Sequence, residues 1–420
     1  MSATYKDLRL NKPDSTFNDC LISSLLKQHF SPAQSAKDPF QIQISKKIAE
    51  VKDALDQLNT NQVPELSYGC LALLETTLRN ASMRYVVISK NGKPVLFAYY
   101  QIFTLTASNF NLENNSAFVK HILKAFVNLK KAKAVMLGNV LRNETTSHCY
   151  DHSVFTVDEA TEAIAGIAEK IAADECATAI VLKELPPITA QAQQLLADNG
   201  YTTPFEDRVM DMDIDPTWHT LADYINALSK KYKTRAKKAL AAIAPLEIKT
   251  LTENEVLQYE QDIDRLFSAT VHQQPFTLTQ PQQGYFTELK RMYKDDFEVI
   301  GFMLEGKLIA FYTAFSGPDY YHIYYVGFDY ALNNTYQLYF NILFLGLERA
   351  ILSGKKVLQL GRTSFDAKAS LGAKARPLSY FIKMEYIPDF MVKWFVKYFS
   401  AMENSKWKQR NPLKENGSMA

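Results

Sequence analysis

The sequence predicts an α/β protein made of two units in tandem, each with a mixed central sheet flanked by helices. At 420 residues, the chain exceeds the roughly 100–200 residues of one ordinary domain. Two β-hairpin patterns also occur about half a chain apart. Apolar residues make up 47% and charged residues 22% of the sequence, which is typical of a folded globular protein.

Each hairpin is centred on a dipeptide that tolerates the positive φ angles of a tight turn, Asn91-Gly92 and Glu305-Gly306. β-Rich runs flank the two turns: 83–88, 94–102, 297–304 and 308–315.

Helical and strand patterns follow both hairpins. Apolar spacing predicts a helix over 116–129 before a strand over 132–140, and a helix over 334–352 before a strand over 355–363. We therefore expect the order hairpin, helix, strand ending in Leu-Gly to be duplicated. The first unit continues with four predicted elements: helix 157–174, strand 177–182, helix 189–197 and an extended segment over 201–214.

A linking helix is predicted from Pro216, which fits a first helical turn, to about Ile243. An amphipathic helix is expected in the aromatic, basic stretch after Phe381, packed on the second unit. The predicted divisions are 1–214 for the first unit, 215–244 for the basic linking helix and 245–420 for the second unit.

Composition excludes several classes of function. The 47 basic and 45 acidic residues leave a net charge of +2, so no global field attracts nucleic acid and a DNA-binding role is not expected. The four cysteines have no CxxC spacing, and His148 and His152, expected in a surface loop, have no third ligand nearby, so no metal is predicted. Without a signal peptide pattern or an apolar run of ~18 residues, we expect a cytoplasmic protein with no transmembrane span.

One segment resembles a phosphate cradle, in which a strand leads into a helix start whose free amides attract anions. The strand over 320–330 ends in Val326, Gly327 and Phe328, and Asn333 or Asn334 is expected to cap the following helix. The amides predicted to face a donor pyrophosphate belong to Asn334, Thr335, Tyr336 and Gln337.

The same strand carries the weak catalytic candidates Tyr324 and His322. Strand alternation places Tyr320, His322 and Tyr324 on one face and Tyr321, Ile323 and Tyr325 on the other. A tyrosine or histidine in a cleft can donate to a leaving thiolate or accept an amine proton. Packing within the sheet is the alternative and the commoner role of such residues.

Four segments carry a resemblance to known proteins: GRTSFDAKASLGAKARP at 361–377, which is the most specific, LSKKYKTRAKKA at 228–239, AIVLKEL at 179–185 and MLGN at 136–139. Together they resemble bacterial GNAT-like proteins (the N-acetyltransferase superfamily) related to Fem-type aminoacyltransferases. The glycine-rich loop common in GNAT enzymes is absent from the sequence.

The resemblance favours substrate or phosphate binding by Gly361, Arg362, Thr363 and Lys368. Arg362 is suited to bidentate binding of carboxylate or phosphate, and Lys368 supplies a mobile point charge. An ion pair of Arg362 with Asp366 is the structural alternative. On the functional interpretation, Arg362→Ala and Lys368→Ala are expected to leave the fold intact.

The linking helix aligns Lys231, Arg235 and Lys238 on one face. This face either binds phosphates of CoA, tRNA or a nucleotide-linked precursor, or is simply solvated. The helix is expected to join the two units at a shared cleft.

The function implied by the resemblance is transfer of an acyl or aminoacyl group from a thioester or ester donor to a small-molecule or peptide-like amine. Acyl-CoA or acetyl-CoA is the expected co-substrate. The alternatives are an aminoacyl-tRNA-dependent transferase acting on a peptidoglycan-type precursor and a non-catalytic small-molecule-binding protein. Either a monomer or a homodimer is compatible with the sequence.

Overall fold

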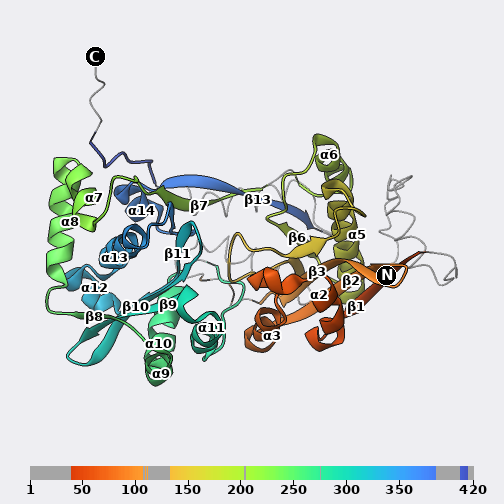
Figure 1. The fold of residues 1–420 in the computed structure, drawn as a ribbon, viewed down its shortest axis with the longest axis horizontal. Helices are drawn as coiled ribbons and strands as arrows, with labels where there is room; N and C mark the ends of the chain where they lie inside the picture. Colours follow the sequence, from red (N-terminus) through yellow and green to blue (C-terminus); the bar gives the residue numbers. More distant parts are fainter. Residues whose placement is uncertain are drawn as a thin grey trace, which may run out of the picture.

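The structure, a computed structural model, describes residues 39–106, 109, 111, 133–202, 205–274, 276–384 and 407–414. Its described strands form one 13-stranded mixed sheet that runs through both halves of the chain (Figure 1). The path across the sheet is β1-β2-β3-β4-β6-β13-β7-β12-β11-β10-β9-β8, and β5 pairs with β3 outside this path.

The first half supplies these elements: β1 (Phe40–Ser45), α2 (Lys52–Gln57), α3 (Tyr68–Thr77), β2 (Ala81–Lys90), β3 (Lys93–Thr104), β4 (Lys133–Leu137), β5 (His148–Tyr150), α5 (Val157–Glu175), β6 (Ala179–Lys183), α6 (Ala190–Asp198) and β7 (Phe205–Asp213). Short 3-10 turns lie at η1 (Ile48–Val51), η2 (Thr60–Gln62) and η3 (Pro64–Leu66).

The second half supplies the remainder: α7 (Leu221–Ala227), α8 (Lys230–Ala242), β8 (Glu247–Thr250), α9 (Glu253–Gln258), α10 (Glu260–Val271), α11 (Tyr285–Tyr293), η5 (Lys294–Asp296), β9 (Phe297–Leu304), β10 (Lys307–Ser316), β11 (Tyr320–Phe328), α12 (Tyr330–Tyr336), α13 (Leu338–Leu352), β12 (Val357–Gln359), α14 (Phe365–Leu371) and β13 (Lys374–Met384).

The sheet has a pseudo-two-fold order centred on the antiparallel pair β13–β7. Outward from this pair, β6, β4, β3, β2 and β1 on one side match β12, β11, β10, β9 and β8 on the other. The matched pairings also agree in direction: β4–β6 and β11–β12 are parallel, whereas β6–β13 and β12–β7 are antiparallel. Each unit therefore places its last strand beside the sheet of the other unit.

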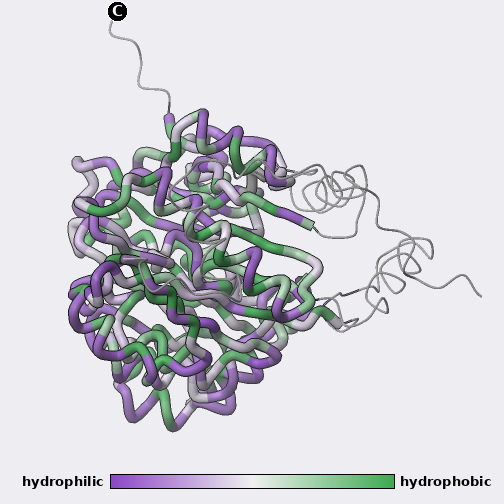
Figure 2. Tube along the Cα trace, turned by 90° about the vertical axis from the view of Figure 1, so that its right-hand side faces the viewer, coloured by the Kyte–Doolittle hydropathy of each residue, from purple (hydrophilic) through white to green (hydrophobic). Residues whose placement is uncertain are grey.

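Helices cover both faces of this sheet. On one face, a single hydrophobic cluster includes residues of α2 and α3 from the first unit and of α9, α10 and α11 from the second. On the other face, α5 and α6 cover the first unit, and α7, α8, α13 and α14 cover the second. Figure 2 shows the hydrophobic stretches running mainly through the interior of the chain trace. The predicted fold class, two α/β units with mixed sheets and flanking helices, is confirmed.

Most predicted first-unit elements are found within a few residues of their expected bounds, including both strands of the Asn91-Gly92 hairpin and helix α5. Helix α5 begins at a capping box, in which Thr156 Oγ1 accepts from the Glu159 amide and Glu159 caps Thr156 in return. The helix predicted over 116–129 and most of the C-terminal segment after Phe381 lie outside the described residues.

Two predictions of element order are wrong. The duplicated order makes the strand over 132–140 equivalent to 355–363. In the structure, β4 lies between β3 and β6, just as β11 lies between β10 and β12. The strand at 133–137 therefore corresponds to β11. The linking helix is not continuous, because Leu228 adopts an extended conformation and separates α7 from α8. Both helices pack against α13, and Figure 1 shows α8 at the outer edge of the second unit, so α8 does not lie at a cleft shared by the units.

We predict that Gly327→Ala destabilises the protein. A Cβ at Gly327 would lie 2.8 Å from the backbone of Leu266 and Phe267 in α10, and such overpacking costs about 1–3 kcal/mol. Urea unfolding measures this loss.

The matched control is Gly69→Ala in α3, where the new Cβ would meet only the Met292 methyl at 3.6 Å. Because alanine is the better helix former, this variant should be neutral or more stable by up to about 1 kcal/mol. Equal destabilisation of both variants would show that α10 does not limit the space at Gly327.

Candidate functional site

The candidate site lies where β11 and β12 stop pairing. Register pairs join β12 only to Tyr320, Tyr321 and His322, whereas β11 continues alongside β10 to Phe328. We call this region, comprising Tyr324–Phe328 and the facing loop Gly361–Ser364, the second-unit splay. The matching first-unit splay follows Met136, where the pairing of β4 with β6 ends. Strand amides in a splay are free of the neighbouring strand and can bind a ligand instead.

A β-bulge changes which way the side chains of β11 point. Register slips between Tyr312 and Ala314, and the Thr313 hydroxyl accepts from the Tyr325 amide at 3.0 Å and donates to the Tyr325 carbonyl at 3.2 Å. Tyr325 consequently packs in the same cluster as Tyr320 and Tyr324. The predicted alternation, with Tyr325 on the opposite face, is wrong because the bulge inserts one residue.

The Gly361–Ser364 loop has an unusual backbone. Gly361, Thr363 and Ser364 have φ angles of 70°, 66° and 53°, and a β-branched residue such as threonine rarely adopts this conformation. Lys368, buried in helix α14, donates from Nζ to the carbonyls of Gly361 and Arg362, both at 3.1 Å. Strain of this kind persists only where surrounding contacts enforce it, often at functional sites.

The predicted residues His322 and Lys368 lie close together with Arg142 from the first unit. Burial lowers the pKa of His322 to about 3, and the charges of Arg142 and Lys368 act in the same direction. His322 is therefore neutral at physiological pH and is a weak proton acceptor. Lys368 is buried and hydrogen-bonds to the loop carbonyls, so it is not the mobile charge expected from the sequence.

Arg142 connects the two units. Its guanidinium lies 4.0 Å from the centroid of the Phe315 ring, 3.3 Å from Glu65 Oε1 and 3.2 Å from the Tyr320 hydroxyl. Within the described part of the chain, its buried Nε has no hydrogen-bond partner, and the same holds for Tyr99 OH and Gln101 Nε2 on neighbouring β3. Orphaned buried donors of this kind call for an unseen polar partner, such as water or ligand.

Three tyrosines complete the region. The Tyr324 and Tyr285 hydroxyls lie 2.9 Å apart, and the Tyr325 hydroxyl donates to the Leu141 carbonyl at 3.1 Å. Burial raises the pKa of Tyr324 and Tyr325, and the nearby Arg362 charge opposes the increase at Tyr325. These phenols stay protonated at neutral pH and serve as hydrogen-bond donors.

The predicted phosphate cradle differs from the structure. Asp329, not Asn333 or Asn334, caps α12 by accepting from the Ala331 amide, so Asn334, Thr335 and Tyr336 lie inside this helix. Gln337 adopts a left-handed conformation and separates α12 from α13. Asn333 Oδ1 accepts from the Tyr339 amide at 3.0 Å, so one amide at the start of α13 is already bonded.

The other predicted residues fall in two places. Val326, Gly327 and Phe328 lie in the second-unit splay, although Gly327 is also required by the close approach of α10. Lys231, Arg235 and Lys238 are exposed on α8 and are not near this site. The structural alternative was an ion pair between Arg362 and Asp366, but Asp366 pairs with Arg410 instead, at 2.8 Å.

The first-unit splay is filled by the chain itself. Lys183, buried at the end of β6, donates from Nζ to the carbonyls of Asn139 and Arg142 at 2.8 and 2.5 Å. These two carbonyls, in the loop after β4, therefore hold an internal cation. The two splays are alike in topology but not in occupancy.

Sequence reasoning missed Arg142, Glu65, Tyr285 and Tyr325 as site residues. Arg142 follows the MLGN motif closely in sequence, and matching MLGN to β11 rather than β12 would have placed it at a splay. Glu65 in η3 and Tyr285 in α11 have no local signal, because they come from segments far apart in the chain.

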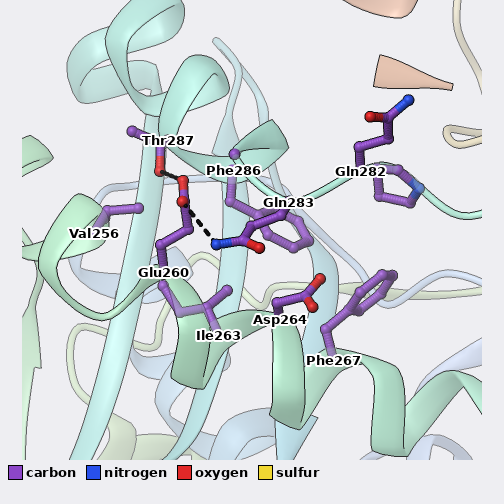
Figure 3. A pocket seen from close by; sticks show the side chains of 11 residues that line it. Val256, Glu260, Ile263, Asp264, Phe267, Gln282, Gln283, Phe286 and Thr287 are labelled. Carbon is purple, nitrogen blue, oxygen red and sulfur yellow. Dashed lines mark hydrogen bonds between the residues drawn. The ribbon is translucent and has the colours of Figure 1, made fainter.

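Other chemistry in the described residues is limited. A cavity of about 10 Å³ lies between α10 and α11 (Figure 3), where Glu260 accepts from Thr287 Oγ1 at 3.0 Å and Gln283 Nε2 at 3.1 Å. This volume holds about one water. Within the described part of the chain, no cluster of His, Cys, Asp and Glu could hold a metal ion, and no helix is long and apolar enough to cross a bilayer. His148 begins strand β5 rather than a surface loop.

Several solved structures are similar to this chain at low sequence identity. No protein-family profile and no curated protein sequence matches the chain. Among solved structures, it is similar to a tandem GNAT protein from the clavulanic acid biosynthesis pathway, with 11% identity, a TM-score of 0.46 and coverage of 83% of this chain and 100% of that one. It is also similar to FemX, with 12% identity, a TM-score of 0.42 and coverage of 77% and 92%. A GCN5-related N-acetyltransferase from Anabaena variabilis matches at 11% identity and a TM-score of 0.43, with coverage of 82% and 73%.

We predict that Lys368→Met destabilises the protein and that Arg362→Ala does not. Removing the Lys368 ammonium leaves two loop carbonyls without their donor, at a cost of about 1–3 kcal/mol each. Arg362 is exposed, so its loss should change the free energy of unfolding by less than about 0.5 kcal/mol. Urea denaturation distinguishes the two outcomes, and an unchanged stability of Lys368→Met would restore the sequence expectation for that residue.

We also predict acid sensitivity caused by two histidines. Burial lowers the pKa of His322 to about 3 and that of His148 to about 4, so the folded state keeps both neutral while the unfolded state protonates them below pH 6.5. Their contribution to stability is complete above pH 6.5 and is lost as the pH falls toward these values. At pH 5, each histidine should cost about 2 kcal/mol relative to pH 7.

His322→Asn and His148→Asn should each remove about half of this combined loss, measured by urea unfolding at pH 7, 6 and 5. An equal loss of unfolding free energy between pH 7 and pH 5 in wild type and His322→Asn would show that His322 titrates freely in the folded protein.

Proposed function

We propose that the protein transfers an acyl group from a thioester or ester donor to an amine acceptor at the second-unit splay. The observation that carries this proposal is the end of β11–β12 pairing at His322, opposite a strained loop that presents exposed Arg362. Unpaired strand amides are suited to the carbonyl of an acyl group, and a guanidinium is suited to an anionic carrier.

The donor would lie with its acyl carbonyl along Tyr324–Phe328 and its phosphate or carboxylate at Arg362. The bond at Asn333 leaves α13 with fewer free starting amides, so Arg362 takes a larger part in holding a donor such as acyl-CoA or acetyl-CoA.

In the transfer step, the neutral amine nitrogen attacks the acyl carbonyl carbon, forming the C–N bond as the C–S or C–O bond to the carrier breaks. Tyr324, linked to Tyr285 at 2.9 Å, donates a hydrogen bond to the leaving sulfur or oxygen, and the amine proton passes to solvent. Burial raises the pKa of the Cys70 thiol, which makes it a poor nucleophile, so direct transfer is favoured over a covalent enzyme intermediate. The site acts mainly by positioning.

The first unit would contribute to acceptor binding. Arg142 and the Leu141 carbonyl reach the tyrosines of β11, whereas Lys183 fills the corresponding first-unit splay. One chain therefore carries one donor site.

One observation favours a second candidate, a non-catalytic binder with the same fold. The pKa of His322 is lowered to about 3 and that of Tyr324 is raised, so neither has a pKa near neutrality, where a general base is most effective. A binder would need only the splay and Arg362.

Thermal-shift titration with CoA, acetyl-CoA and a long-chain acyl-CoA tests the proposal. A donor at 100 times its dissociation constant should stabilise the protein by about 2.7 kcal/mol. Arg362→Ala should abolish this shift, whereas the control Arg265→Ala, on α10 with its side chain 57% exposed, should retain it.

Stabilisation by CoA and acyl-CoA without any transfer to an amine panel would favour the binder. No shift with any of the three ligands would exclude a CoA donor and leave an aminoacyl ester as the donor to test.

A further inference from the structure

Helix α8 has a charge arrangement that opposes its own stability. Its sequence, KKYKTRAKKALAA, has six basic residues and no acidic one. Lys230, Lys231 and Lys233 lie in the first turn, at the positive end of the helix dipole, and Ser229 supplies no side-chain cap. Like charges also face each other four residues apart at Lys231 and Arg235. An anionic ligand would reverse each of these unfavourable terms.

These charges are exposed, and within the described residues no carboxylate pairs with them. The exposed members are Lys230, Lys231, Arg235, Lys237 and Lys238. Two carboxylates of neighbouring elements are already engaged: Asp223 caps α7 and Asp366 pairs with Arg410. By contrast, basic residues elsewhere commonly have acidic partners, as Arg291 does with Glu253 and Glu288.

The apolar side of α8 is occupied by the fold. Ala236 and Ala239 are buried in the second-unit core, and the Ala239 carbonyl accepts from Asn341 Nδ2 at 2.8 Å. The one exposed apolar residue of α8 is Ala241, whose single methyl group gives the outer face little to insert into a lipid bilayer. A hydrophilic polyanion is the better fit.

The basic surface extends beyond the helix. The segment 407–414 packs at the start of α8, where the Ser229 amide donates to the Pro412 carbonyl at 2.9 Å. This segment adds exposed Lys408 and Lys414. Thirteen helical residues cover about 20 Å at 1.5 Å per residue, which is longer than one pyrophosphate and spans several phosphates of a nucleic-acid strand.

We propose that α8 and the segment 407–414 form a binding site for the phosphodiester backbone of RNA. Contacts are to phosphates, so the site is expected to be insensitive to sequence and sensitive to salt. This site is separate from the second-unit splay, and its binding does not depend on acyl transfer.

The test is binding of a fluorescein-labelled 20-nucleotide single-stranded RNA to the full chain, measured by anisotropy at 50–200 mM salt. Charge reversal in Lys231→Glu/Arg235→Glu/Lys238→Glu should weaken binding at least about 30-fold and reduce the slope of log affinity against log salt by about 2. Thermal unfolding should be unchanged or improved, because the substitutions remove repulsion within the helix.

The matched control is Lys46→Glu/Lys93→Glu/Lys307→Glu, which changes net charge equally at exposed positions outside α8 and should stay within about 3-fold of wild type. Absence of RNA binding by the wild type at 50 mM salt would overturn the proposal, as would equal losses in both triple variants. Binding to vesicles containing 30% phosphatidylserine that is lost with the α8 charges, while RNA binding is unchanged, would reassign the surface to membranes. Retention of RNA binding by Arg362→Ala keeps this test independent of the donor site.

Discussion

The antiparallel pairing of β13 with β7 is the constraint on which the rest of the structure depends. Seven register pairs, from Lys374–Asp211 to Tyr380–Phe205, join the last strands of the two units, and each strand also pairs with the sheet of the opposite unit. Neither unit can complete its sheet alone, because a strand edge would be left with unpaired amides and carbonyls. The two halves therefore fold as one sheet with a shared hydrophobic cluster on one face.

This exchange also explains why the two units do not remain equivalent. A two-fold arrangement brings two similar splays to the centre of the molecule, and a single chain can change one without changing the other. Lys183 fills the first with a cation held by two carbonyls. In the second, Lys368 hydrogen-bonds to two carbonyls of the Gly361–Ser364 loop, and the Arg362 side chain is exposed. The first unit then supports the second through Arg142, which reaches Tyr320 across the junction.

The elements that the sequence predicts well are those with local signals. The Asn91-Gly92 and Glu305-Gly306 hairpins and the capped helix α5 depend on turn and cap chemistry within a few residues. The β11 bulge, the break at Gln337 and the partners of Arg142 depend on contacts between distant segments, and no periodic pattern records them. Arg362 and His322 lie in segments with local sequence patterns, so the sequence identifies them as candidates. Glu65 and Tyr285 lie in segments without such a pattern, so the sequence does not.

The protonation states around the second-unit splay limit the chemistry it can perform. His322 is neutral, the Tyr324 and Tyr325 phenols hold their protons, and Cys70 remains a thiol. The charged groups nearby are Arg142, Arg362 and Lys368, with Glu65 paired to Arg142, and this excess of positive charge would favour an anionic donor in the proposed transfer. On the proposed function, an acceptor would therefore arrive as a free amine or lose its proton to solvent. In the proposed transfer, such a site would act by aligning an activated donor with its acceptor, so the reactivity would be carried by the donor itself.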